Sequence, residues 1–298
     1  MADNTFLNDY MRRRFGCKVY KLSLNGGMSC PNRDGTIGSR GCIFCSGGGS
    51  GEFAAPVHLS IAEQMQYGKD LLHSKLKNTQ RVKYVPYFQA FTNTYAPVEL
   101  LRRLYTEALA PEDVVGLSIA TRPDELPEPV LALLEELGRD SGKEIWVELG
   151  LQTIHEKTAA YIRRGYSLPC FEKALADLNE IGVKVVVHVI FGLPGESRED
   201  MLATVKYLGR KPIFGIKIQN LQVLKDTDLE QDYLAGKVPV MTMEEYVGLV
   251  RESLDILPKD IVVHRITGDP PGKLLVAPQW CRNKRKVMNA CLERENII

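Results

Sequence analysis

Short apolar runs rich in β-branched residues alternate with longer amphipathic segments along the whole chain. Seven of the short runs have the length and composition of β-strands. The run at residues 183–191 is almost continuously apolar, which is typical of a strand that is covered on both faces. The seven predicted strands are residues 17–24, 83–91, 114–121, 144–151, 183–191, 213–221 and 260–266.

Helix start and stop signals lie between the predicted strands. Side chains that can cap a first turn occur within residues 60–63, 197–200 and 242–245. Gly182 directly follows the helical pattern of residues 168–181, where a left-handed C-cap is expected. Strand and helix therefore alternate about six times, and this alternation predicts parallel strands joined by right-handed crossovers.

Two α/β architectures fit this alternation: an open doubly wound sheet, and a full or partial barrel. The phosphate-binding fingerprints of open sheets, GxGxxG after the first strand and GxxxxGK[ST], do not occur in the sequence. This favours a partial (β/α)6 barrel like part of a TIM barrel, in which reactive groups gather at the carboxyl ends of the strands. We expect residues 1–270 to form the barrel with an N-terminal site loop, and residues 271–298 to form a short basic C-terminal extension.

The composition of the 298 residues is that of an ordinary folded protein. Hydrophobic residues make up 44% and charged residues 25%, which excludes wholesale disorder, and the formal charge of +1 gives no global basic field. No apolar run approaches the roughly 18 residues that a membrane span requires. The first five residues lack the positive and apolar regions of a secretory signal. These observations predict a cytoplasmic protein with no membrane partner.

Three of the seven cysteines follow the first predicted strand. Cys30, Cys42 and Cys45 have the spacing C-x11-C-x2-C, which fits a [4Fe–4S] cluster with one iron left open, or a zinc ion with His58 as the fourth ligand. Three unliganded buried thiols are the remaining alternative, but the surrounding loop is rich in glycine and polar residues. We interpret the glycine-rich residues 47–51 as part of this site loop, because they begin two residues after Cys45.

The cysteine pattern and four further segments resemble the radical-SAM superfamily. Within it, the sequence is similar to the radical-SAM domain of the Elongator catalytic subunit and its bacterial relatives. Phe44 supplies the aromatic residue that commonly precedes the last cysteine. The likeness covers roughly residues 17 to 270. The matching segments are SIATRPD at residues 118–124, VELGLQ at 147–152 followed by RRGY at 163–166, the stretch from GVKVVVH to LPG at 182–195, and the stretch from GIKI to TDL at 215–229.

The resemblance implies a [4Fe–4S] cluster on Cys30, Cys42 and Cys45, with S-adenosylmethionine at the open iron. Cleavage of this cofactor then yields a 5′-deoxyadenosyl radical. Gln152 and Arg164 match positions that contact S-adenosylmethionine, with Arg164 pairing to its carboxylate. The other candidate cofactor contacts are Phe44, Gln89, Ser118, Glu148 and His188.

Without the resemblance, several of these residues have plainer interpretations. Glu148 and Gln152 form an ordinary hydrogen-bonded pair at a strand end, and His188 is a core histidine. Two segments also depart from the family pattern. Residues 89–94 read QAFTNT where the family has a glycine-rich strand end, and Ala120 stands in place of a glutamate, so Ser118 or another strand has to bind the ribose.

Basic residues concentrate near both ends of the chain. They lie at residues 12–14 with Lys18 and Lys21, and at residues 282–286 beside Trp280. One interpretation is solvated surface; the other is phosphate contact on both sides of the barrel mouth, with Trp280 or Tyr166 stacking on a base.

The Elongator resemblance implies a tRNA partner and modification of the C5 side chain of a wobble uridine. It also implies an electron donor such as flavodoxin or ferredoxin. Two alternatives stay open: a radical-SAM enzyme that acts on a small molecule or peptide, and a non-catalytic metal-binding module.

Overall fold

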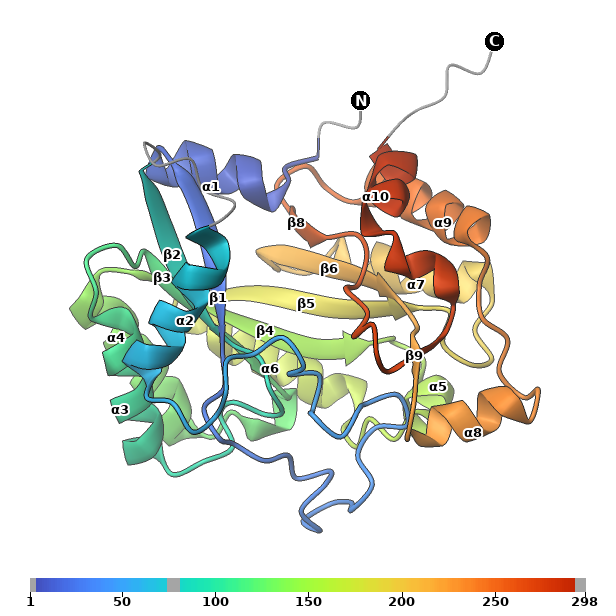
Figure 1. Ribbon diagram of the computed structural model, residues 1–298, viewed down its shortest axis with the longest axis horizontal. Helices are drawn as coiled ribbons and strands as arrows, with labels where there is room; N and C mark the ends of the chain where they lie inside the picture. The colour runs from blue at the N-terminus through green and yellow to red at the C-terminus, as the bar shows by residue number, and fades with distance from the viewer. Residues whose placement is uncertain (1–3, 74–80, 293–298) are drawn as a thin grey trace.

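The computed structural model describes residues 4–73 and 81–292. Seven parallel strands form one curled sheet in the order β1-β2-β3-β4-β5-β6-β8 (Figure 1). This confirms the predicted partial barrel and all seven predicted strands. Their bounds are β1 Lys18–Leu24, β2 Val82–Phe88, β3 Gly116–Thr121, β4 Glu144–Gln152, β5 Lys184–Phe191, β6 Gly215–Asn220 and β8 Val262–Arg265.

Helices that connect consecutive strands cover the convex face of the sheet (Figure 1), while α1 precedes the first strand and α10 follows the last. Their bounds are α1 Leu7–Phe15, α2 Ile61–His73, α3 Val98–Leu109, α4 Glu128–Ser141, α5 Glu156–Tyr161, α6 Leu168–Glu180, α7 Arg198–Leu208, α8 Asp228–Leu234, α9 Met243–Ile256 and α10 Lys284–Leu292, with short 3-10 turns at Pro123–Glu125 and Gln279–Arg282. The predicted caps are confirmed. Reciprocal capping boxes begin α7 and α9, Ser60 exchanges hydrogen bonds with Glu63 before α2, and Gly182 is left-handed with φ +72°.

Helix α1 closes the amino end of the barrel. Its Tyr10 packs edge-on against Trp146 of β4 and Phe214, and Met11 is buried beside them. Arg14 pairs with Glu144, the first residue of β4, at 2.9 Å. Because all seven strands run in the same direction, their carboxyl ends meet at the opposite edge, which α1 leaves open.

The segment after β8 packs back onto the barrel. Strand β9, Leu275–Ala277, pairs antiparallel with β7, Val223–Leu224. Helix α10 lies against α9 (Figure 1), and Val287 and Cys291 of α10 are buried. The first part of the predicted C-terminal extension is therefore in contact with the core.

No helix within residues 4–73 and 81–292 combines the length and apolar character that crossing a bilayer requires. The prediction that the chain lacks an export signal rests partly on residues 1–3, which lie outside the described residues.

Candidate functional site

The loop between β1 and α2 carries the three clustered cysteines. Backbone hydrogen bonds fold it tightly: Cys45 N donates to Cys42 O (3.0 Å), and Arg33 N donates to Cys30 O (2.8 Å). The Arg33 guanidinium also crosses the loop and donates to the carbonyls of Cys45 (2.8 Å) and Ser46 (2.6 Å). The sequence from Cys30 to Ser46 is thus held as one compact unit.

The glycine-rich stretch packs this unit against the carboxyl end of β2. Gly49 has φ +61°, and a Cβ at this position would lie 2.4 Å from the Phe91 ring. Phe91 N in turn donates to Gly49 O (3.0 Å). A side chain does not fit here, so the stretch belongs to the site loop, as predicted, and is not a linker.

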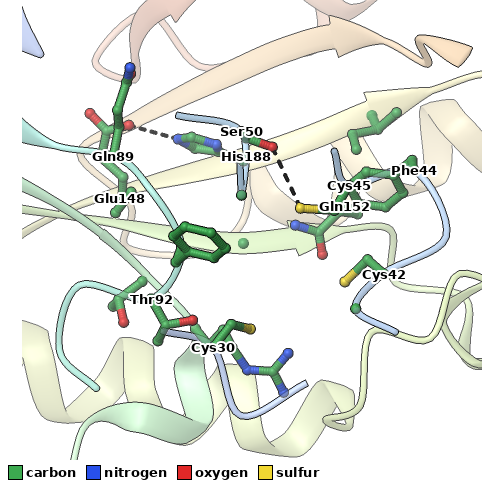
Figure 2. Close-up of a pocket in the computed structure, with 18 of the residues that line it drawn as sticks. Cys30, Cys42, Phe44, Cys45, Ser50, Gln89, Thr92, Glu148, Gln152 and His188 are labelled. Atoms are coloured by element: carbon green, nitrogen blue, oxygen red, sulfur yellow. Dashed lines mark hydrogen bonds and ion pairs between the residues drawn. The ribbon is translucent and has the colours of Figure 1, made fainter. Parts of the chain in front are cut away.

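A cavity of about 240 Å³ opens at the carboxyl edge of the sheet and is lined by all three cysteines (Figure 2). We call it the inner cavity. Eight of the ten predicted site residues contribute to its wall: Cys30, Cys42, Phe44, Cys45, Gln89, Glu148, Gln152 and His188. Residues far apart in the sequence therefore converge at the carboxyl ends of the strands, where the predicted barrel fold places reactive groups.

Gln152 reaches the inner cavity through an unusual backbone geometry. It ends β4 with φ +63°, and its Oε1 lies 3.3 Å from the Tyr166 hydroxyl, which donates to Gly150 O (2.7 Å). A Cβ at Gly150 would come within 2.6 Å of Gln152 Nε2. Gly150 therefore makes room for the amide in the cavity wall.

The structure does not place Arg164 or Ser118 in the cavity wall. Arg164 is 1% exposed, and its guanidinium donates to the carbonyls of Leu151, Thr153 and Tyr166. It also pairs with a glutamate of α5. Ser118 is fully buried beneath the cavity. In this structure Arg164 fastens the loop after β4 through its hydrogen bonds, and Ser118 donates to Glu148. Their contacts with S-adenosylmethionine stay predictions.

Glu148 is 1% exposed and forms the centre of a buried ion cluster, which also contains Lys21, His188 and Lys217. Its Oε1 pairs with Lys21 Nζ and accepts a hydrogen bond from Ser118 Oγ (2.7 Å). Its Oε2 pairs with Lys217 Nζ and lies 2.7 Å from His188 Nε2 (Figure 2). Burial alone would raise the pKa of Glu148, but the two ammonium groups outweigh it and hold this pKa well below its usual range.

The two partners on β5 and β6 have lowered pKa values. Burial lowers the pKa of Lys217 to about 7, although Glu148 opposes the shift. Burial and the charge of Lys217 lower the pKa of His188 to about 4. His188 is therefore neutral near pH 7, and Lys217 is poised between charged and neutral at the floor of the inner cavity.

Lys217, Arg265, Tyr87 and Arg122 also line the inner cavity and were not among the predicted site residues. Lys217 had a signal in the sequence, because it interrupts an apolar predicted strand with a charge. Tyr87 and Arg265 had none, since a tyrosine in a strand and an arginine at a strand end are ordinary there.

The predicted basic surface is only partly correct. Residues 12–14 lie on α1 at the amino end of the barrel, opposite the cavity, and Lys21 is inside the barrel. The Tyr166 ring lies against the guanidinium groups of Arg122 and Arg164, at 4.8 and 5.0 Å, and the Trp280 indole donates to Met241 O (2.8 Å). Both aromatic rings are therefore engaged within the protein.

The chemistry of the thiols fits a bound iron–sulfur cluster. Burial, reinforced by the neighbouring Cys45, raises the pKa of Cys42 to about 12, and burial also raises the pKa of Cys45. The three cysteines are partly exposed in the wall of the inner cavity, and iron bound between them would supply the positive charge that keeps them as thiolates. Among the described residues, no three His, Cys, Asp or Glu side chains are arranged to hold a single metal ion. His58 is exposed and does not line the inner cavity, so the structure does not bring it to the three cysteines as a fourth ligand.

Comparisons with known proteins agree with this geometry. Residues 34–208 match the Radical SAM superfamily, and residues 213–295 match the Radical SAM C-terminal domain. The chain is 45% identical over 284 residues to an uncharacterized protein of Bacillus subtilis, YtqA, covering 95% of this chain and 87% of YtqA. It is 30% identical over 186 residues to a tRNA uridine(34) acetyltransferase of Methanocaldococcus jannaschii, covering 61% of this chain and 34% of that enzyme.

A solved structure has a similar fold. The archaeal Elp3 of Methanocaldococcus infernus superimposes with a TM-score of 0.65 at 21% identity, covering 87% of this chain and 58% of that chain. The curled parallel sheet, the cysteine loop at its carboxyl edge and the matched residues lead to one conclusion: the chain belongs to the Radical SAM superfamily, whose cofactors are a [4Fe–4S] cluster and S-adenosylmethionine.

Proposed function

We propose that the protein modifies tRNA by radical chemistry and that its target is the C5 side chain of the wobble uridine. The observation that carries the proposal is the convergence of three thiols, two amides and a cationic floor in one cavity of a Radical SAM barrel. The likeness to a tRNA uridine(34) acetyltransferase supports the choice of substrate. Because the match covers only 34% of that enzyme, acetyl transfer is not part of the proposal.

Each group in the inner cavity has a role in this proposal. Cys30, Cys42 and Cys45 would hold the cluster, and with S-adenosylmethionine and an electron donor such as flavodoxin or ferredoxin it would supply a 5′-deoxyadenosyl radical. Gln89 and Gln152 present amide groups that orient S-adenosylmethionine, and Phe44 shields one side of the cavity from water. The buried ion cluster holds the side chains at the floor of the inner cavity in fixed positions, so that the substrate would be held in one orientation toward the radical.

One experiment tests the radical chemistry. Anaerobically reconstituted wild-type protein is expected to form 5′-deoxyadenosine under a chemical reductant, and Cys45→Ala is expected to abolish it. Cys170→Ala is the matched control, because Cys170 lies on α6 outside the inner cavity. Cleavage that persists in Cys45→Ala, or is lost equally in Cys170→Ala, would contradict the assignment of the cluster.

A second experiment tests the substrate. Deleting the gene is expected to change the modified wobble uridines that nucleoside mass spectrometry detects in total tRNA, and wild-type but not Cys45→Ala protein is expected to restore them. If S-adenosylmethionine is cleaved in vitro but the tRNA nucleosides stay unchanged, the enzyme acts on a different substrate.

A further inference from the structure

Two further cavities continue outward from the inner cavity. The middle cavity shares Phe44, Gln89 and Arg265 with the inner one. The outer cavity shares Phe53, Gln89 and Arg265 with the middle one and is the largest of the three, at about 450 Å³. The three cavities are therefore adjacent and share parts of their walls.

The outer cavity is lined by an aromatic side chain and by cations from a different segment of the chain. Phe53 comes from the cysteine loop and is 56% exposed. Arg282 and Lys284 come from the segment after β9 and line the same cavity. We call Phe53, Arg282 and Lys284 the outer rim.

Charge is strongly biased in the segment that supplies Arg282 and Lys284 to the outer cavity. Residues 271–292 contain five basic residues and no acidic one, although the whole chain carries only +1. Asp269 is the acidic group in the outer cavity, and it is held by Arg265 at 2.9 Å and Lys284 at 2.7 Å. Arg282 donates to Gln279 Oε1 (2.6 Å) and stays largely exposed. The rim thus attracts a polyanion.

We propose that the outer rim binds the nucleotide next to the modified one, with Phe53 stacking on its base and Arg282 and Lys284 contacting its phosphates. An exposed aromatic ring beside a cationic wall is the arrangement that single-stranded nucleic acids require, because every base offers a π-face and every linkage a negative charge. Gln89 and Arg265 line both the inner and the outer cavity, and the lining of the outer cavity contains none of the three cysteines. Its occupant is therefore a neighbour of the reacting nucleotide. This inference rests on the proposed function and deepens it.

The test measures the affinity of reconstituted full-length protein for an unmodified tRNA transcript at several salt concentrations. Phe53→Ala is expected to weaken binding roughly tenfold without changing the salt dependence, and Phe53→Tyr to keep most of the affinity. The double variant Arg282→Gln/Lys284→Gln is expected to lower the slope of log K against log salt by about 1.4.

Two controls remove an exposed apolar side chain or two exposed charges at residues that do not line the outer cavity. Leu234→Ala removes a side chain that is 72% exposed on α8. Arg12→Gln/Arg13→Gln removes two charges from α1 at the amino end of the barrel. Both are expected to bind tRNA as the wild type does, and iron content and unfolding midpoint verify that every variant is intact.

The outcomes separate this inference from the proposed function. If wild-type protein binds tRNA but Phe53→Ala binds it equally well, or if both double variants weaken binding to the same extent, the outer rim is not a nucleotide site. If wild-type protein cleaves S-adenosylmethionine but binds no tRNA at physiological salt, the proposed function itself fails. Retention of a peptide instead of tRNA would overturn both.

Discussion

Lys217 places a positive charge inside the barrel, where a charge is stable only when an opposite charge pairs with it. The residue is 7% exposed, and its ammonium pairs with Glu148 and lies 3.4 Å from the Tyr87 hydroxyl. One carboxylate serves two lysines, so the buried ion cluster carries an excess of positive charge when both are protonated. The charged groups that face Lys217 are Glu148 on β4, Lys21 on β1, and Arg265 on β8, with His188 on β5 as a further titratable neighbour.

This arrangement predicts a specific pH dependence of stability. The pKa of Lys217 falls from 10.5 to about 7 on folding because of burial, so between these values the unfolded chain binds more protons than the folded one. The free energy of unfolding of the wild type, relative to Lys217→Met, is therefore expected to rise from pH 7 to pH 10, by at most about 1.4 kcal/mol per pH unit. Urea unfolding of both proteins across this range measures it. A constant difference would show that Lys217 keeps an ordinary pKa in the folded protein.

At the scale of elements, the site depends on one loop that is fastened at several points. The loop from Cys30 to Ser46 is held by its own hydrogen bonds. Ile43 ties it to the end of α5 and to α8, because Ile43 N donates to Ile162 O and Leu229 N donates to Ile43 O. The contact between Gly49 and Phe91 fastens it to the carboxyl end of β2, and this contact is therefore one of those that place the cluster ligands at the inner cavity.

Two neighbouring glycines test the contact. Gly49→Ala is expected to reduce the iron bound per chain and to destabilise the protein by at least 1–2 kcal/mol, roughly the cost of a left-handed residue with a Cβ, because the methyl group also meets the Phe91 ring. Gly47→Ala is the matched control, since a Cβ there has nothing within 4 Å. Iron analysis and thermal unfolding measure both effects. Equal iron content in the two variants would show that the loop is positioned by other contacts.

The sequence predicts elements better than it predicts contacts within the site. All seven strands and the caps were predictable because they depend on periodicity and on residues within one turn. Arg164 shows the limit: its position in the chain matches a family contact, but its hydrogen bonds go to carbonyls set by the path of the loop after β4. Lys21 shows the same limit, because a basic run in the sequence does not reveal that a strand turns one member inward.

At the scale of the whole molecule, the C-terminal segment joins the barrel mouth to the core. Leu275 of β9 is 3% exposed and packs in a small apolar cluster with Leu224 and Cys281. The same segment supplies Arg282 and Lys284 to the outer cavity. The rim and the barrel are therefore expected to unfold together, and the basic segment is not a separate tail.

Leu275→Ala tests this coupling. Removing a buried leucine typically costs about 2–5 kcal/mol, and we expect the lower part of this range because the cluster is small. The loss should appear as a lower midpoint of one cooperative transition, while Leu234→Ala, which truncates a side chain that is 72% exposed, should change stability by less than about 0.5 kcal/mol. Calorimetry distinguishes the two outcomes. If Leu275→Ala instead produced a separate early transition and left the main midpoint unchanged, the segment would fold independently of the barrel, and the outer rim would be held less firmly than the cavity it extends.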